Sequence, residues 1–168
     1  GEGRTIEARF GDLSVISLYL PSGSSGDHRQ ESKDRFLDLF LPLLRQRRED
    51  GRKYILCGDW NIAHRQIDIK NWKSNQKNSG FLPHERAWMD ELLSGVGYVD
   101  AFRVVNQEAE QYTWWSNRGN AWENNVGWRI DYHIISPDLA DKVQGASIYR
   151  DEKFSDHAPL ILDYDFPL

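Results

Sequence analysis

Short apolar strands alternate with helical patterns along this chain, and that alternation restricts its fold more than any other feature. Residues 13–20 (LSVISLYL) and 53–58 (KYILCG) are apolar runs of strand length. Between them, residues 21–30 have the Pro, Gly and Ser content of a loop, and residues 32–48 carry apolar side chains at helical spacing despite Pro42. Strands mixed with helices in this way favour an α/β architecture, in which helices pack in layers on a β-sheet.

The second half of the chain predicts further helices and strands of the same kind. Residues 83–97 are typical of a helix, with Pro83 near its start. A short helix is expected over 136–143, where Ser136 would cap the first turn. Three more strands are predicted, at 112–115, 128–136 and 159–166. Because the chain has no internal repeat and no linker, residues 1–168 are expected to form a single domain.

The composition excludes several classes of protein. A net charge of −5 argues against a general binder of polyanions, and no apolar run approaches the roughly 18 residues that cross a bilayer. Cys57 is the only cysteine, which excludes an internal disulfide and favours a reducing compartment such as the cytoplasm. The chain opens at Gly1, within a segment that already resembles strands from the middle of a domain. We therefore expect a fragment that lacks its N-terminal portion.

Positive charge is concentrated in two stretches of the sequence. Residues 45–48 (RQRR) lie at the end of the predicted helix, where such a run is usually solvated. Residues 70–78 (KNWKSNQKN) hold three lysines and no acidic residue, interleaved with amides and one tryptophan. This mixture suits contacts with nucleic-acid phosphates, although an ordinary polar loop has a similar composition.

An acid and an amide follow directly on the strand at 53–58. In an extended segment, residues two apart point to the same side, so Asp59 and Asn61 face one place just beyond the strand end. The loops after strand ends are where enzymes built on sheets commonly carry their chemistry. The pair can bind a water molecule, a metal ion or a phosphate there. Asp and Asn also make turns and helix caps, and that structural alternative stays open.

Two further acidic clusters lie in the C-terminal half. Asp156 and His157 are adjacent, immediately before the last predicted strand. Asp131 lies within the apolar strand 128–136, where a carboxylate is costly unless it is paired or hydrogen-bonded. It could therefore orient a histidine and stabilise its charged form. Trp128, three residues before Asp131, would point to the opposite face of a regular strand, so at most one of the two faces a shared site unless a bulge intervenes.

Together, the three clusters indicate a site for a hard cation. Carboxylate and amide oxygens with one histidine suit Mg²⁺ or Mn²⁺ better than zinc. The chain has no zinc-binding spacing, no Walker loop and no GxSxG motif. A hard cation in an oxygen-rich site is the usual equipment for cleaving phosphodiesters. The seven tryptophans could supply stacking surfaces for nucleic acid, or they could fill the core.

Six short motifs occur in order along the chain. They are SVISLYLPSGSSG (14–26), GDWNIAH (58–64), NQKNSGFLPHER (75–86), YTWW (112–115), NVGWRIDY (125–132) and SDHAPL (155–160). This ordered set resembles the exonuclease III family of abasic-site endonucleases, within the endonuclease/exonuclease/phosphatase superfamily. The bacterial enzymes of that family are the most similar.

The resemblance implies a DNase I-like fold, which is a sandwich of two β-sheets with helices outside. It also implies an enzyme that uses Mg²⁺, or Mn²⁺, to cut double-stranded DNA 5′ to abasic sites and to remove blocks from 3′ ends. In the family, the N-terminal portion supplies the glutamate that is the main metal ligand, and residues 1–18 hold no equivalent. The chain is therefore expected to form the C-terminal two-thirds of such an enzyme. As an incomplete sandwich, it would need the missing portion to complete its metal site.

The resemblance also implies a role for each matched residue. Catalytic roles, in placing the attacking water and contacting the scissile phosphate, fall to Tyr19, Asp59, Asn61, Asp131 and His157. Metal contacts fall to Asp156, Asp59 and Asn61. Contacts with the DNA substrate fall to Ser22, Asn75, Asn78, Trp114 and Trp128.

Two alternative functions within the same superfamily remain to be weighed. One is a non-catalytic regulator that binds RNA, similar to the catabolite-repression-control proteins. Their catalytic positions are degraded, whereas GDWN (58–61) and SDH (155–157) are intact here. The other is a phosphodiesterase acting on lipid or inositol phosphates, against which the lysine-rich stretch 70–78 and the tryptophans argue.

Overall fold

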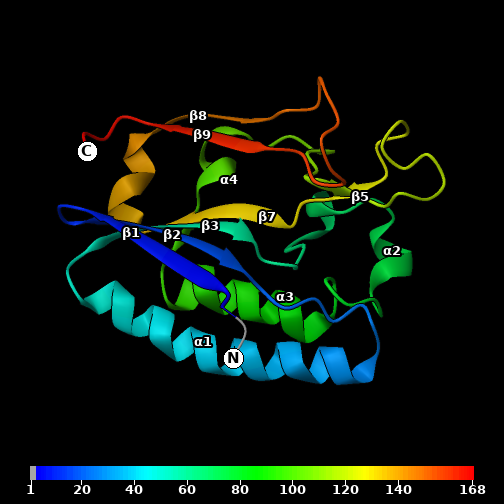
Figure 1. The fold of residues 1–168 in the computed structure, drawn as a ribbon, viewed down its shortest axis with the longest axis horizontal. Helices are drawn as coiled ribbons and strands as arrows, with labels where there is room; N and C mark the ends of the chain where they lie inside the picture. The colour runs from blue at the N-terminus through cyan, green and yellow to red at the C-terminus, as the bar shows by residue number, and fades with distance from the viewer. Residues whose placement is uncertain (1–2) are drawn as a thin grey trace.

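A five-stranded sheet forms the centre of the structure, a computed structural model that describes residues 3–168. Its strands β2 and β3 are parallel, and every other neighbouring pair is antiparallel. In spatial order, the strands are β1 (Thr5–Phe10), β2 (Leu13–Tyr19), β3 (Lys53–Asp59), β7 (Asp131–Ile135) and β4 (Val99–Asp100). The strands predicted at 13–20 and 53–58 are therefore confirmed. They are the parallel pair near the centre of the sheet (Figure 1).

Two helices cover one face of this sheet. Helix α1 (Asp27–Glu49) connects the parallel strands β2 and β3, and α3 (Pro83–Asp90) lies beside it under the sheet (Figure 1). Their apolar sides meet the sheet in the largest core cluster, which includes Leu18, Leu37, Leu44, Leu56, Trp60, Met89 and Ile134. The helix predicted over 83–97 is confirmed, since α3 continues as a π-helical turn, η2 (Glu91–Gly95).

Helix α1 begins earlier than the sequence predicted. Residues 27–30, expected in a loop, form its first turn after Gly26, whose backbone has φ 106°. Asp27 suits that turn because a carboxylate is favourable beside the unpaired N–H groups of a helix N-terminus. At the other end, the arginines at 45–48 are not simply solvated. Arg47 and Arg48 lie over the rings of Tyr54 and Tyr98.

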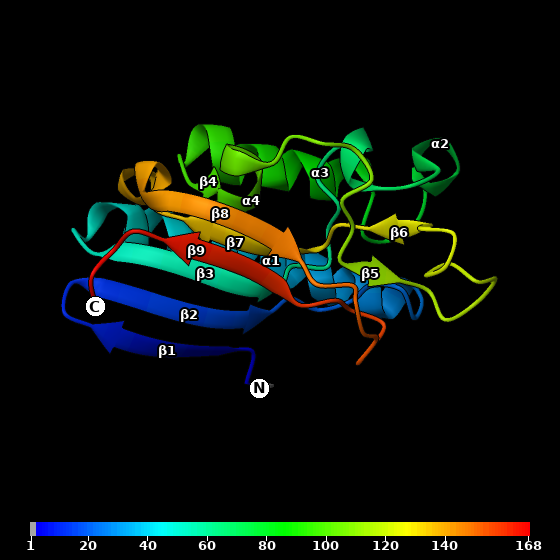
Figure 2. The same cartoon turned by 90° about the horizontal axis from the view of Figure 1, so that it is seen from above.

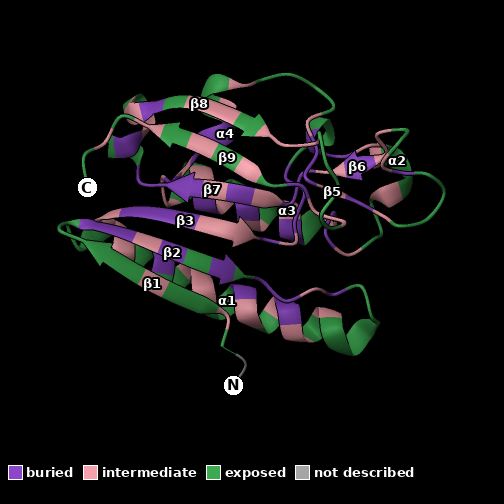
Figure 3. Cartoon of the chain, turned by 45° about the horizontal axis from the view of Figure 1, so that its top comes forward, coloured by how far each residue is buried: buried purple, intermediate pink, exposed green. Residues whose placement is uncertain are grey.

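A second, smaller sheet lies over the opposite face. Its antiparallel strands are β8 (Val143–Ile148) and β9 (Leu160–Tyr164). Leu162 and Tyr164 pack with Leu13, Ile55 and Ile135 in a core cluster of their own, and helix α4 (Ala101–Val105) lies near β8 (Figure 2). The two facing sheets with helices outside confirm the predicted layered α/β fold. The central strands β3 and β7 have no exposed residue, whereas β1 is exposed at nearly every position (Figure 3).

Two predicted elements take a different form. The strand expected at 128–136 is broken, because Arg129 turns inward to pair with Asp68 and Asp100. Its two parts, β6 (Gly127–Trp128) and β7, join different sheets, and β6 pairs with β5 (Trp114–Trp115). The short helix is a 3₁₀ helix, η3 (Pro137–Lys142). Ser136 does not cap it, since its Oγ accepts a hydrogen bond from the N–H of Tyr54 at 2.8 Å, so that prediction was wrong.

The remaining helical turns are short. They are η1 (Gln66–Asp68) and α2 (Trp72–Asn75), which lie in the long connection between β3 and α3. Among residues 3–168, no helix is both long and apolar enough to cross a membrane.

Candidate active site

Three strand ends bring side chains from distant parts of the sequence into one row. Tyr19, at the end of β2, is paired with Asp59, at the end of the parallel strand β3. Asp59 is paired in turn with Asp131, the first residue of the antiparallel strand β7. Register alone therefore places a phenol and two carboxylates beside one another at a single edge of the sheet.

The residues around Asp59 explain why the strand ends in GDWN. Gly58 has φ 138°, and a Cβ atom there would overlap the carbonyl oxygen of Leu18 on the neighbouring strand. Only glycine fits this close approach of two backbones. Trp60 is fully buried against Phe40 and Trp88, so it anchors the chain between the two polar residues that flank it.

Asn61 is held in an uncommon backbone conformation. Its φ of 50° is left-handed, which costs a residue other than glycine about 1 kcal/mol. Its N–H donates to Asp59 Oδ1 at 2.8 Å, and its side-chain Nδ2 donates to the carbonyl oxygen of Leu20 at 2.7 Å. The turn that Asp59 and Asn61 were expected to make as an alternative to chemistry is thus present. It fixes both side chains at the strand end.

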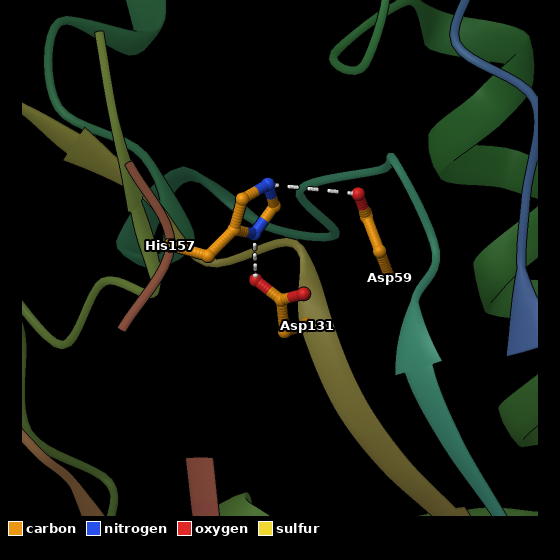
Figure 4. Close-up of side chains that lie close together, drawn as sticks. All are labelled: Asp59, Asp131 and His157. Carbon is orange, nitrogen blue, oxygen red and sulfur yellow. Dashed lines mark hydrogen bonds and ion pairs between the residues drawn. The ribbon is translucent and has the colours of Figure 1, made fainter. Parts of the chain in front are cut away.

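His157, from the segment just before β9, lies beside both carboxylates. Its Nδ1 lies 2.8 Å from Asp131 Oδ2, and its Nε2 lies 3.8 Å from Asp59 Oδ2 (Figure 4). An isolated β-bridge to Trp114 holds the His157 backbone just before β9. The imidazole therefore stands between the two carboxylates, with Nδ1 committed to Asp131 and Nε2 turned toward Asp59. Asp131 orients a histidine, as its position in an apolar strand suggested.

Burial and neighbouring charges shift the pKa values of two of these groups. Burial, reinforced by the negative charge of Asp131, raises the pKa of Asp59 to about 7, although the Asn61 N–H, His157 and Lys33 act in the opposite direction. Burial alone would lower the pKa of His157, but its hydrogen bond to Asp131 and the charge of that carboxylate outweigh burial and raise the pKa. Near neutral pH, Asp59 is thus close to its titration point, as a general base should be.

These side chains face a cavity of about 460 Å³. Eight of the residues predicted from sequence line it, namely Tyr19, Ser22, Asp59, Asn61, Asn78, Trp114, Trp128 and His157. Five lining residues were not predicted: Ser24, Lys33, Ser79, Gly80 and Ile130. A signal for Lys33 was available, because it falls four residues before Leu37 on the apolar side of a helical pattern.

Three predicted residues lie just outside the cavity lining. Asp131 stands behind His157. Asp156 accepts hydrogen bonds from Trp114 Nε1 and Ser155 Oγ, both at 3.0 Å. Burial alone would raise the pKa of Asp156, but these hydrogen bonds outweigh burial and the pKa is lowered. Asn75 is engaged with its own loop, and its Oδ1 accepts a hydrogen bond from Asn78 Nδ2 at 2.8 Å. Asn75 and Asp156 thus support lining residues rather than face the cavity.

Two tryptophans form one wall. Trp114 and Trp128 are paired across β5 and β6, with ring centroids 6.0 Å apart and ring planes at 86°. Edge-to-face packing of this kind fixes both rings. The geometric restriction on Trp128 and Asp131 does not apply, because the strand is broken between them. Trp128 lines the cavity directly, and Asp131 reaches it through His157.

The donor set suits a divalent cation. Asp59, Asp131 and His157 each offer a ligand atom, and these atoms lie within 4.8 Å of one another. The two carboxylates repel each other, as the raised pKa of Asp59 reflects, and a cation would relieve that repulsion. Of the two carboxylates that the sequence implied as metal contacts, Asp59 belongs to this group and Asp156 does not. Asp156 is turned to Trp114 instead.

The fold is that of a known family. The chain belongs to the Endonuclease/Exonuclease/phosphatase family, whose sequence pattern matches residues 1–157. It is 39% identical to an exodeoxyribonuclease of Bacillus subtilis, over 96% of this chain and 64% of that protein. It is also 39% identical to the DNA repair nuclease APEX1 of Danio rerio, over 96% of this chain and 52% of that protein. The chain therefore spans between half and two-thirds of the length of these relatives.

Solved structures agree with the sequence comparison. A 3′ phosphatase, NExo, from Neisseria, bound to a product DNA hairpin, matches with a TM-score of 0.89 and 27% identity. An AP endonuclease from Archaeoglobus fulgidus matches with a TM-score of 0.88 and 27% identity. Each match covers 97% of this chain and 65% of the other.

Proposed function

We propose that the protein to which this chain belongs is a DNA repair phosphodiesterase that cuts double-stranded DNA 5′ to abasic sites and trims blocked 3′ ends. One observation carries the proposal most: the row Asp59, His157 and Asp131 stands beside a cavity walled by Trp114 and Trp128. The names of the relatives, which include exodeoxyribonucleases and AP endonucleases, support the same substrate class.

The chain's own residues supply the proton chemistry in this proposal. Asp59 accepts a proton from the attacking water, because its pKa of about 7 leaves a useful fraction ionised at neutral pH. His157, with its raised pKa, presents a charged Nε2–H to a phosphate oxygen, and Asp131 holds the imidazole in that orientation. Tyr19 and Asn61 line the same cavity and bring further donors to the developing negative charge.

The proposed cofactor is Mg²⁺, with Mn²⁺ as a substitute. The carboxylate oxygens of Asp59 and Asp131 would hold the cation, because His157 cannot both bind a metal and donate from its protonated Nε2. Asn61 and Asp156 lie nearby in the sequence. When bound, such a cation neutralises phosphate charge and makes water more acidic. The roles predicted from sequence are kept in this proposal for the residues that line the cavity and for Asp131, whereas Asn75 and Asp156 act by holding Asn78 and Trp114. The cytoplasmic location that the single cysteine favours is also kept.

The cavity suggests how an abasic site would be selected. A nucleotide without a base costs less to extrude from the helix than an intact one, since no base has to be unstacked. The fixed edge-to-face pair of Trp114 and Trp128 offers an apolar wall against which the bare sugar would pack. An intact nucleotide would have to bring its base into the same limited space.

The first test is incision of a duplex oligonucleotide that contains one abasic site. This chain would be compared with a version extended at its N-terminus to the length of the relatives, each with Mg²⁺ and with EDTA. Cleavage 5′ to the site that EDTA abolishes supports the proposal, and cleavage by the extended version alone would mean that residues 1–168 hold an incomplete site. If neither protein cleaves, the catalytic proposal fails and the RNA-binding regulator is favoured.

Trp128→Ala should separate selection of the abasic site from general DNA binding. Removing the ring opens the apolar wall, so we expect kcat/KM for an abasic duplex to fall about 10- to 100-fold, in line with the loss of apolar contact in a substrate pocket. Affinity for an undamaged duplex should change less than threefold. Trp122→Ala, which alters a tryptophan outside the cavity, is the control. Equal losses for both duplexes would remove Trp128 from the selection step.

A further inference from the structure

A buried ion pair lies at the wall of the cavity, where Lys33 is one of the lining residues. The ammonium group of Lys33, in α1, contacts the carboxylate of Glu85, in the first turn of α3. Their side chains are only 1% and 0% exposed. A buried ion pair usually contributes little net stability, because both charges lose their hydration. A role other than stability is therefore expected for this pair, which lies next to the cavity. Lys33 and Glu85 each form further hydrogen bonds that indicate this role.

Lys33 reaches the loop that follows β3. Its Nζ donates a hydrogen bond of 2.7 Å to the carbonyl oxygen of Asn61. The N–H of the same residue is held by Asp59, and its side chain is held by Leu20. Lys33 thus supplies the third bond that maintains the left-handed conformation of Asn61, and with it the position of that side chain beside Asp59.

Glu85 reaches the opposite wall of the cavity. Its Oε1 accepts hydrogen bonds from the N–H groups of Gly80 at 2.7 Å and Leu82 at 3.0 Å. Gly80 fills the narrow space between two site residues. A Cβ atom on it would lie 2.8 Å from Cζ3 of Trp128 and 3.3 Å from the carbonyl oxygen of Asn61. Because Gly80 lies between Asn61 and Trp128, the hydrogen bond from Gly80 to Glu85 helps to set the separation of these two residues.

We propose that Lys33 and Glu85 are positioning residues, which clamp the Asn61 loop to the segment 78–82 and so fix the width of the cavity between Asn61 and Trp128. Neither residue needs to touch the substrate. The effect on catalysis rests on the function proposed above, whereas the positions of the two loops can be measured without any activity. If the pair only joined α1 to α3, its loss would lower stability and leave the loops in place.

The double variant Lys33→Met/Glu85→Met separates these possibilities. It removes both charges at once, so no lone charge is left buried and the fold should persist. Lys33→Arg, which retains a cation able to donate to both partners, is the conservative variant. The matched control is Arg45→Met/Glu91→Met. That pair also joins α1 to the helical segment after α3, at 2.5 Å, but lies outside the cavity lining.

Two measurements are needed, and the first does not depend on activity. Amide hydrogen exchange of this chain should be at least tenfold faster at Gly80 and Leu82 in Lys33→Met/Glu85→Met, with strands β3 and β7 as protected as before. Cleavage of the abasic duplex by the extended version should show kcat lowered about 10- to 100-fold with KM within threefold, as expected when reacting groups are misplaced. Lys33→Arg should keep kcat within threefold of the wild-type value.

The outcomes are distinct. If exchange at Gly80 and Leu82 is unchanged in the folded double variant, or if the Arg45/Glu91 control loses as much kcat, the clamp is wrong. If the wild-type protein does not cleave at all, the proposed function fails, and amide exchange still decides whether Lys33 and Glu85 hold the two loops.

Discussion

Replacing Asp59 by asparagine is expected to lower turnover about 100- to 10,000-fold, the range for loss of a general base. Asparagine has nearly the same shape and keeps an oxygen that can accept the Asn61 N–H, so the loop should stay in place. It cannot take a proton from water. Single-turnover cleavage of an abasic duplex should therefore collapse, while the Kd for the same duplex in EDTA should change less than threefold. If binding falls in step with turnover, Asp59 is structural.

The same variant should be more stable than the wild type at alkaline pH. The pKa of Asp59 rises from its ordinary value of 3.8 to about 7 in the folded protein. Between those values, the folded state binds more protons than the unfolded state, so stability falls as pH rises through this window. Asparagine carries no charge to bury. We expect a gain of roughly 1–3 kcal/mol at pH 8 and little change at pH 4.

Thermal unfolding of the wild type and the variant in EDTA, at both pH values, measures this gain. Asp138→Asn, at an exposed position in η3 outside the cavity lining, is the control for removing a carboxylate elsewhere in the chain. A variant that is equally stabilised at pH 4 and pH 8 would contradict the assignment of the burial penalty to the ionised carboxylate.

Part of the site followed from the sequence because it lies at a strand end. The strand pattern at 53–58 placed Asp59 at such an end, whereas Tyr19 was named by the family resemblance and Asp131 was expected inside a longer strand. The register of β2, β3 and β7 brings the three together. The spacing of Asp59 and Asn61 likewise predicted a shared direction. These are local properties, and local patterns report them well.

The features that the sequence did not reveal depend on partners far away in the chain. The strand at 128–136 breaks because Arg129 finds Asp68 and Asp100, which are 61 and 29 residues distant. Lys33 belongs to the site because Glu85 neutralises it from another helix. No pattern within either segment specifies its partner. The edge strand β8 was missed for a different reason, since VQGASI has weak alternation and a glycine in its middle.

His157→Ala is the second substitution expected to have a large effect. It removes the group that stands between the two carboxylates, and we expect kcat to fall about 100-fold or more. Asp131→Asn leaves the imidazole in place but removes the charge that raises its pKa. That charge also raises the pKa of Asp59. Both pKa values should therefore fall in Asp131→Asn, and the whole pH–rate profile should move to lower pH.

The direction of that movement makes the experiment informative. An activity that needs ionised Asp59 and charged His157 rises with pH as the first loses its proton and falls as the second does. Losing the Asp131 charge moves both limbs the same way, whereas general damage to the site lowers the profile without moving it. Asp90→Asn is the control, because Asp90 forms an equivalent contact with His64 at 2.6 Å outside the cavity lining. An unmoved profile in Asp131→Asn would show that the carboxylate does not set the charge state of His157.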